Sequence, residues 1–169
     1  MASEIKVDTI VNAGGDNDTG IDLATNDQIL LKVANATKLT MNSTGQTTIV
    51  GEGGTNTTSL QQGLAKVWTH WNADGTPSIR DSINSASITD HATGDQSINF
   101  TNGMSNANYT VSGAVGNGND TDGVNSQIRR GTSSTTAQRY TIQYAGGSPV
   151  GTALYDYQYT SGIIHGDLA

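Results

Sequence analysis

The sequence contains no cysteine, which excludes disulfide bonds, a thiolate zinc site and a cysteine nucleophile. No apolar run approaches the roughly 20 residues that a membrane-spanning helix requires. The first ten residues include Glu4 and Asp8 and lack the apolar segment of a secretory signal. We therefore expect a chain that neither inserts into a membrane nor enters a secretory route, and these absences alone name no function.

Basic residues are scarce, with 8 Lys and Arg against 15 Asp and Glu and a net charge of -7. Binding to duplex nucleic acid relies on basic side chains that displace counterions, so we expect no nucleic-acid partner. Only 14% of residues are charged, which argues against disorder, and Gly, Asn, Thr and Ser are abundant. This composition predicts short strands joined by tight turns that gain burial by pairing with further copies of the chain.

Aromatic residues are few and unevenly placed. Residues 1–67 contain none, and all nine lie from Trp68 onward. We therefore predict three segments: a stranded N-terminal region over 1–57, a helical connector over 58–67 and a larger domain over 68–169.

The N-terminal region shows short runs in which apolar and polar residues alternate, as in Ile29, Leu31 and Val33. From Ile21 these runs recur every 8 to 10 residues and are separated by turn residues, which indicates a β-meander or a β-solenoid. Each strand offers only two or three medium-sized aliphatic residues, so such a layer would be marginal alone. Three copies wrapped about an axis would share these faces and hide the strand edges.

The spacing of apolar residues predicts one helix of about two turns, capped by Thr58 or Ser59. Gly63 weakens this helix by about 1 kcal/mol relative to alanine. The helix could pack against its symmetry mates on the axis. The residues that we expect at such an interface between copies are Leu60, Leu64, Val67 and Trp68.

The C-terminal segment alternates in the same way but carries aromatic residues. Tyr140, Ile142 and Tyr144 share one parity, and Ile98 and Phe100 repeat the pattern. About six such strands separated by turns predict an antiparallel β-sandwich, and the segment is long enough for a core of its own. The expected fold is thus all-β: a stranded shaft, a short helix and a sandwich head.

Three features of the head are candidates for contact with a receptor. The loop over 116–123 is rich in Gly, Asn and Asp, and polar loops on a rigid scaffold often bind, although a turn without a partner is an equal alternative. A group of arginines could meet anionic groups or could form salt bridges between strands. A stripe of tyrosines could stack on sugar rings or could pack in the core. The candidate contact residues are Asn117, Asn119, Asp120, Asp122, Arg129, Arg130, Tyr155 and Tyr157.

Acidic turns invite a calcium interpretation, but their spacing does not support it. The segment beginning at Asp16 places Gly20 at the fifth position and Asp27 at the twelfth, and Asp120 would place Gly131 at the twelfth, so neither fits an EF-hand. Solvated turns are the simpler interpretation. The spacing of carboxylates selects no pair for glycoside hydrolysis, and no serine lies in a nucleophile elbow. We therefore predict no metal, no cofactor, no catalytic residue and no enzymatic activity.

Two blocks of the sequence resemble tail-fibre proteins of bacteriophages, chiefly those of marine phages. The first block consists of residues 6–12 (KVDTIVN) and 19–23 (TGIDL), which look like the N-terminal lead of such fibres. The second and more specific block is similar to a C-terminal β-domain of these fibres, and it comprises residues 59–68 (SLQQGLAKVW), 79–82 (IRDS), 87–90 (SITD), 94–95 (GD), 98–101 (INFT) and 104–109 (MSNANY).

The resemblance implies an intertwined homotrimer with a structural role in the virion. Its C-terminal head would attach the tail to a host surface glycan or protein, and the N-terminal region would join other tail proteins. Many such fibres begin with a long anchoring domain, for which we see no room here. A capsid or baseplate decoration that bridges virion proteins without binding a receptor is the alternative. The lack of cysteine fits assembly in a reducing bacterial cytoplasm.

Overall fold

The structure, a computed structural model, describes residues 7–12, 14, 18–51, 53–116, 127–144 and 153–169. The chain divides into two compact units, residues 1–64 and 65–169, which are described separately below. Antiparallel strands dominate both units and only one short helix occurs in the described residues, so the all-β prediction is confirmed. Within that part of the chain, no helix has the length and apolar character needed to cross a membrane.

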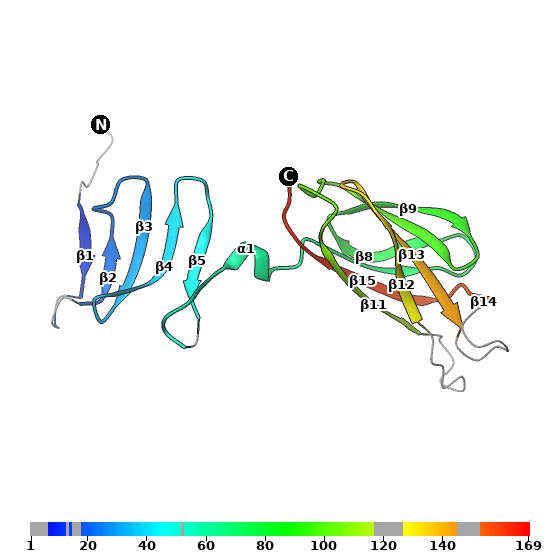
Figure 1. Ribbon diagram of the computed structural model, residues 1–169, viewed down its shortest axis with the longest axis horizontal. Coiled ribbons are helices and arrows are strands. Elements are labelled where there is room, and N and C mark those ends of the chain that lie inside the picture. The colour runs from blue at the N-terminus through cyan, green and yellow to red at the C-terminus, as the bar shows by residue number, and fades with distance from the viewer. Residues whose placement is uncertain (1–6, 13, 15–17, 52, 117–126, 145–152) are drawn as a thin grey trace. The chain divides into compact units, whose positions relative to one another are not determined.

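The N-terminal unit is a single six-stranded antiparallel sheet in which each strand pairs with the next along the chain (Figure 1). Ala34 and Asn35 both have positive φ angles, as a two-residue type I′ hairpin between the third and fourth strands requires. This order is a β-meander within one chain. The strands are β1 (Thr9–Val11), β2 (Gly20–Asp22), β3 (Gln28–Val33), β4 (Ala36–Asn42), β5 (Thr47–Val50) and β6 (Thr57–Ser59).

The helix is shorter than predicted. Helix α1 covers only Leu60–Gly63, and Ser59 caps it by accepting a hydrogen bond from the backbone N–H of Gln62 at 3.3 Å. The chain is already extended at Leu64, with φ -88° and ψ 143°. The predicted continuation to Val67 is wrong because Val67 belongs to the C-terminal unit, where strand pairing and burial outweigh the helical spacing.

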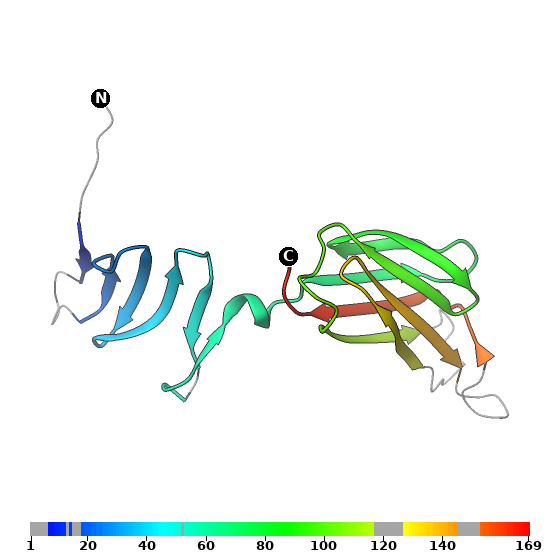
Figure 2. The same cartoon turned by 45° about the horizontal axis from the view of Figure 1, so that its top comes forward.

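The C-terminal unit consists of two antiparallel sheets packed face to face, which is the arrangement of a β-sandwich (Figure 2). Within one sheet the strand order is β11-β15-β7-β8, and within the other it is β12-β13-β10-β9, with β14 paired to β13. The strands are β7 (Val67–Asn72), β8 (Ser78–Ile83), β9 (Ser85–Ala92), β10 (Asp95–Phe100), β11 (Thr110–Gly116), β12 (Gln127–Ser133), β13 (Ala137–Tyr144), β14 (Ala153–Leu154) and β15 (Tyr159–His165).

The hydrophobic core lies between these two sheets and uses alternate residues of each strand. Ile98 and Phe100 are buried as their alternation predicts, and so are Tyr140 and Ile142, whereas Tyr144 at the end of the same strand is exposed. Trp71 packs against Tyr140, with ring centroids 5.7 Å apart. The core also contains polar side chains that the hydrophobic pattern does not reveal, above all the buried Gln96 and Gln138.

Candidate functional site

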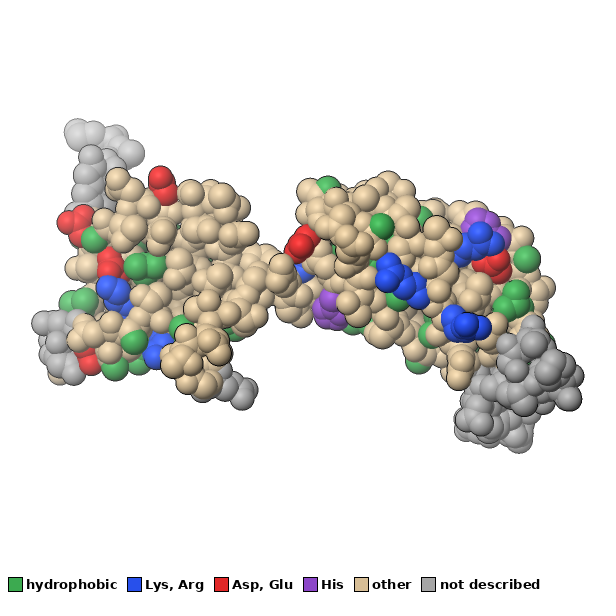
Figure 3. Space-filling view, viewed as in Figure 1, with side chains coloured by type: hydrophobic (Ala, Val, Ile, Leu, Met, Phe, Trp, Pro, Cys, Tyr) green, Lys and Arg blue, Asp and Glu red, His purple; other side chains and the backbone are tan. Residues whose placement is uncertain are grey.

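The N-terminal sheet carries an aliphatic face that no described residue of its own unit covers. Directly paired residues project to the same side of a sheet, and the register pairs Ile21 with Leu31, Leu31 with Leu39 and Leu39 with Ile49. Exposed hydrophobic side chains on this unit are visible in Figure 3. We call this surface the aliphatic face; its residues are Ile10, Ile21, Ile29, Leu31, Leu39, Met41 and Ile49.

The opposite side of the same sheet is mostly polar. Thr40 pairs with Thr48 there, and Lys32 forms an ion pair with Asp22 on the adjacent strand. The hydrogen bond from Lys32 lowers the pKa of Asp22. The two sides therefore differ in chemistry. Only for the aliphatic face is contact with water unfavourable, because apolar surface is stabilised by removal from water.

The four predicted interface residues lie in different environments. Leu60, the first residue of α1, and Leu64, its C-cap, are exposed, Leu64 to 56%, and remain candidates for contact between copies. Val67 is only 1% exposed within its own unit, so the prediction that it lies at an interface is wrong. Trp68 is half-buried and pairs with Ile163 and Ile83 on the outer side of its sheet.

The predicted arginine group is not free to act as one basic patch. Arg130 donates from Nε to Ser133 Oγ at 2.7 Å and from Nη2 to the carbonyl of Ala107 at 2.9 Å, and it lies over the ring of Tyr109. Arg129 is exposed and donates to Oε1 of Gln143 at 3.0 Å. The other predicted contacts in this region, Asn117, Asn119, Asp120 and Asp122, lie outside the described residues.

The predicted tyrosine stripe does not form one face of a strand. Tyr155 and Tyr157 lie in the segment between β14 and β15, and only Tyr159 belongs to a strand. Tyr157 is 3% exposed in the core, so its prediction as a receptor contact is wrong, whereas Tyr155 is 50% exposed. The strict alternation of the three tyrosines misleads because the chain turns between them.

Tyr155 borders a polar pocket at one end of the sandwich. The cavity has a volume of about 300 Å³, and three connections of the C-terminal unit contribute to it: β7–β8, β9–β10 and β14–β15. Its lining consists of Asp74, Thr93, Tyr155, Asp156 and Gln158. The sequence pattern identified only Tyr155 as a contact residue, since the other four are scattered turn residues that only the fold brings together.

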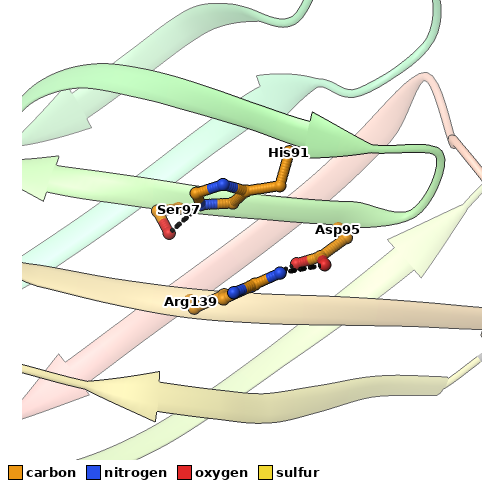
Figure 4. Close-up of polar contacts among 4 residues, drawn as sticks. All are labelled: His91, Asp95, Ser97 and Arg139. Atoms are coloured by element: carbon orange, nitrogen blue, oxygen red, sulfur yellow. Dashed lines mark hydrogen bonds and ion pairs between the residues drawn. The ribbon is translucent and has the colours of Figure 1, made fainter.

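A second polar cluster lies on β9, β10 and β13 (Figure 4). His91 Nε2 and Ser97 Oγ are 2.9 Å apart, which is the distance expected of a nucleophile and its base. The nearby carboxylate of Asp95 faces Arg139 instead, accepting a hydrogen bond from Nε at 2.6 Å, and this bond lowers the pKa of Asp95. Asp95 is thus engaged by Arg139 rather than by His91, and Ser97 is buried, so the contacts among these four described residues do not form the acid, base and nucleophile chain of a catalytic triad.

Comparisons with protein-family models, with curated proteins and with solved structures find no match for this chain. The described residues contain no group of three or more His, Asp or Glu side chains that could hold a metal ion. The acidic turn that begins at Asp16 and the turn at Asp120 lie wholly or partly outside the described residues. Two features therefore stand out for function: the aliphatic face and the pocket beside Tyr155.

Proposed function

We propose that this chain is a structural fibre protein of a bacteriophage virion, a homotrimer whose C-terminal unit attaches the tail to the host surface. The observation that supports this proposal most directly is the uncovered aliphatic face. A single-layer sheet of short strands gains too little burial to be stable alone, and an aliphatic surface of this extent requires a partner. Further copies of the same chain supply that partner.

Identical copies suit the aliphatic face because the residues that form it carry no charge. Copies can therefore meet there without like-charge repulsion, although each chain carries a net charge of -7. The ion pair between Asp22 and Lys32 lies on the other side of the sheet. Three sheets that turn their aliphatic faces inward would form a closed core and leave the threonine-rich sides in water. The exposed Leu60 and Leu64, at the two ends of α1, would extend this core.

The C-terminal unit supports a binding role because it is a self-sufficient scaffold with a buried core and a pocket at one end. Three such units in one particle increase the overall affinity through avidity, even where each individual contact is weak. The alternative is a capsid or baseplate decoration that bridges virion proteins. In the fibre the head lies distal and in water, and in the decoration it is covered by other virion proteins, so labelling of intact particles with an antibody against residues 65–169 separates the two.

The first test is the mass of the full-length protein in solution, measured by light scattering at micromolar concentration. We expect three times the chain mass of 17.5 kDa. A monomer at this concentration overturns the fibre proposal, because the aliphatic face would then be stable in water. A trimer that also blocks adsorption of phage particles to host cells supports the attachment role.

A further inference from the structure

We propose that the pocket beside Tyr155 binds a neutral, hydroxyl-rich saccharide unit. This inference rests on the proposed attachment function and narrows its receptor to a glycan without anionic groups. The pocket is concave and small, with a volume of about 300 Å³, and it combines one exposed aromatic ring with several polar side chains. Such a combination fixes the orientation of a small ligand through a few polar groups around an apolar contact.

The ring of Tyr155 lies beside two other tyrosine rings. It lies 5.0 Å from the ring of the buried Tyr157 and 6.5 Å from that of Tyr144, measured between centroids. Its backbone N–H also donates to the carbonyl of Ile142 at 3.1 Å. A ring that is fixed before binding loses little conformational entropy on contact, so its exposed side can pack against the C–H groups of a sugar.

The carboxylate of Asp156 is oriented to accept hydrogen bonds from a ligand. Its Oδ1 accepts from the backbone N–H of Gly94 at 2.7 Å and from Nε2 of the buried Gln96 at 3.4 Å. Its Oδ2 has no hydrogen-bond partner among the described residues and remains available to accept from ligand hydroxyl groups. Hydrogen bonds to an ionised acceptor are stronger than those between neutral groups, which favours a ligand with several hydroxyl donors.

Gly94 explains why the pocket can form at this turn. Its φ of +63° is strained for other residues, and a Cβ atom here would lie 2.6 Å from the backbone nitrogen of Tyr155. The close approach of the β9–β10 turn to the segment before β15 therefore depends on glycine. It brings Thr93 and Asp156 to the same cavity.

The charge of the pocket determines which saccharides fit. Asp74 and Asp156 both line it, and no Lys or Arg side chain is among its described lining residues. Two carboxylates repel sulfate, phosphate and sialic-acid groups, and the net charge of -7 adds to this repulsion. The ligand is therefore a neutral sugar, in contrast to the anionic receptor that the arginines suggested from the sequence.

The test uses the full-length protein and saturation-transfer NMR with galactose, glucose, mannose and N-acetylglucosamine, and with N-acetylneuraminic acid as the anionic probe. We expect binding of at least one neutral sugar and none of the anionic one. Tyr155→Ala and Asp156→Asn should each weaken binding at least tenfold. The matched controls Tyr159→Ala, an exposed ring outside the pocket, and Asp81→Asn, an exposed carboxylate, should leave it unchanged.

Three results would overturn the inference: binding of no neutral sugar, preferential binding of N-acetylneuraminic acid, or equal losses in the pocket variants and their controls. The proposed function is tested separately, by the mass of the protein in solution and by whether the purified protein blocks adsorption of phage particles. A trimer that blocks adsorption but binds no neutral sugar overturns the saccharide pocket and leaves the fibre proposal intact. A monomer that binds a neutral sugar overturns the fibre proposal and leaves the saccharide pocket intact.

Discussion

The indole N–H of Trp71 donates a hydrogen bond of 2.8 Å to Oε1 of Gln96, from one sheet of the C-terminal unit to the other. Both side chains are fully buried. The amide nitrogen of the same Gln96 donates to the carbonyl of Ala73 and to Asp156. Gln96 thus provides the acceptor for the buried indole N–H of Trp71 and also donates a hydrogen bond to the carboxylate of Asp156 in the pocket.

Gln96→Leu should destabilise the C-terminal unit by about 1–3 kcal/mol, because it leaves the Trp71 N–H buried without an acceptor. Urea unfolding of the full-length protein, followed by tryptophan fluorescence, measures this loss, since both tryptophans lie in this unit. Gln127→Leu at the exposed start of β12 is the control and should change stability by less than about 0.5 kcal/mol. Equal effects of both variants would contradict the role assigned to the buried bond.

Gly162→Ala should destabilise the same unit by about 1–3 kcal/mol through overpacking. A Cβ atom at this position in β15 would lie 2.8 Å from Oη of Tyr140 and 3.5 Å from Trp71. Gly116→Ala at the end of β11 is the matched control, since its nearest neighbour would be 3.8 Å away. Thermal unfolding should separate the two variants, and an unchanged melting temperature for Gly162→Ala would show that the core can relax around a methyl group.

The ion pair between Asp95 and Arg139 predicts a specific dependence of stability on pH. The pKa of Asp95 in the folded state lies below its usual value of 3.8, first because Arg139 donates hydrogen bonds to it. Its stabilising contribution is therefore complete above about pH 4 and is lost as the pH falls through the lowered pKa.

Asp95→Asn should accordingly flatten the curve of unfolding free energy against pH between about pH 4 and 2. The control is Asp90→Asn on β9, an exposed carboxylate without an ion pair in the described part of the chain. Urea midpoints measured across this pH range test the expectation. A curve for Asp95→Asn that runs parallel to the unmodified protein would contradict it.

Leu39→Asp and Thr40→Asp place the same charge on neighbouring residues of β4 that project to opposite sides of the sheet. Both substitutions introduce aspartate, which is unfavourable in a strand, so a difference in the mass of the two variants shows which side of the sheet contacts other copies. Leu39→Asp should dissociate the trimer at micromolar concentration, whereas Thr40→Asp should leave its mass unchanged. Dissociation by Thr40→Asp alone would assign the interface to the polar side.

The alternation of apolar residues was sufficient to predict strands in both units. It grouped Ile98 with Phe100 and Tyr140 with Ile142 on shared strand faces, and all four residues are buried in the core. This works because a period of two is a local property of extended chain. The helical spacing failed at Val67 and the alternation failed at Tyr157, because periodicity does not say which partner a residue meets or where the chain turns. Val67 joins a strand rather than a helix, and Tyr157 turns inward next to the exposed Tyr155.

The candidate pocket was largely beyond sequence reasoning. Asp74, Thr93 and Asp156 belong to three separate connections, and nothing in their spacing links them. Composition and alternation determined that the chain is all-β, acidic and without aromatic residues in its first third, since these are sums over local preferences. The tertiary structure alone decided that no described residue of the N-terminal unit covers one side of its sheet and that distant turns meet around Tyr155, because the pairing of strands sets which side chains become neighbours.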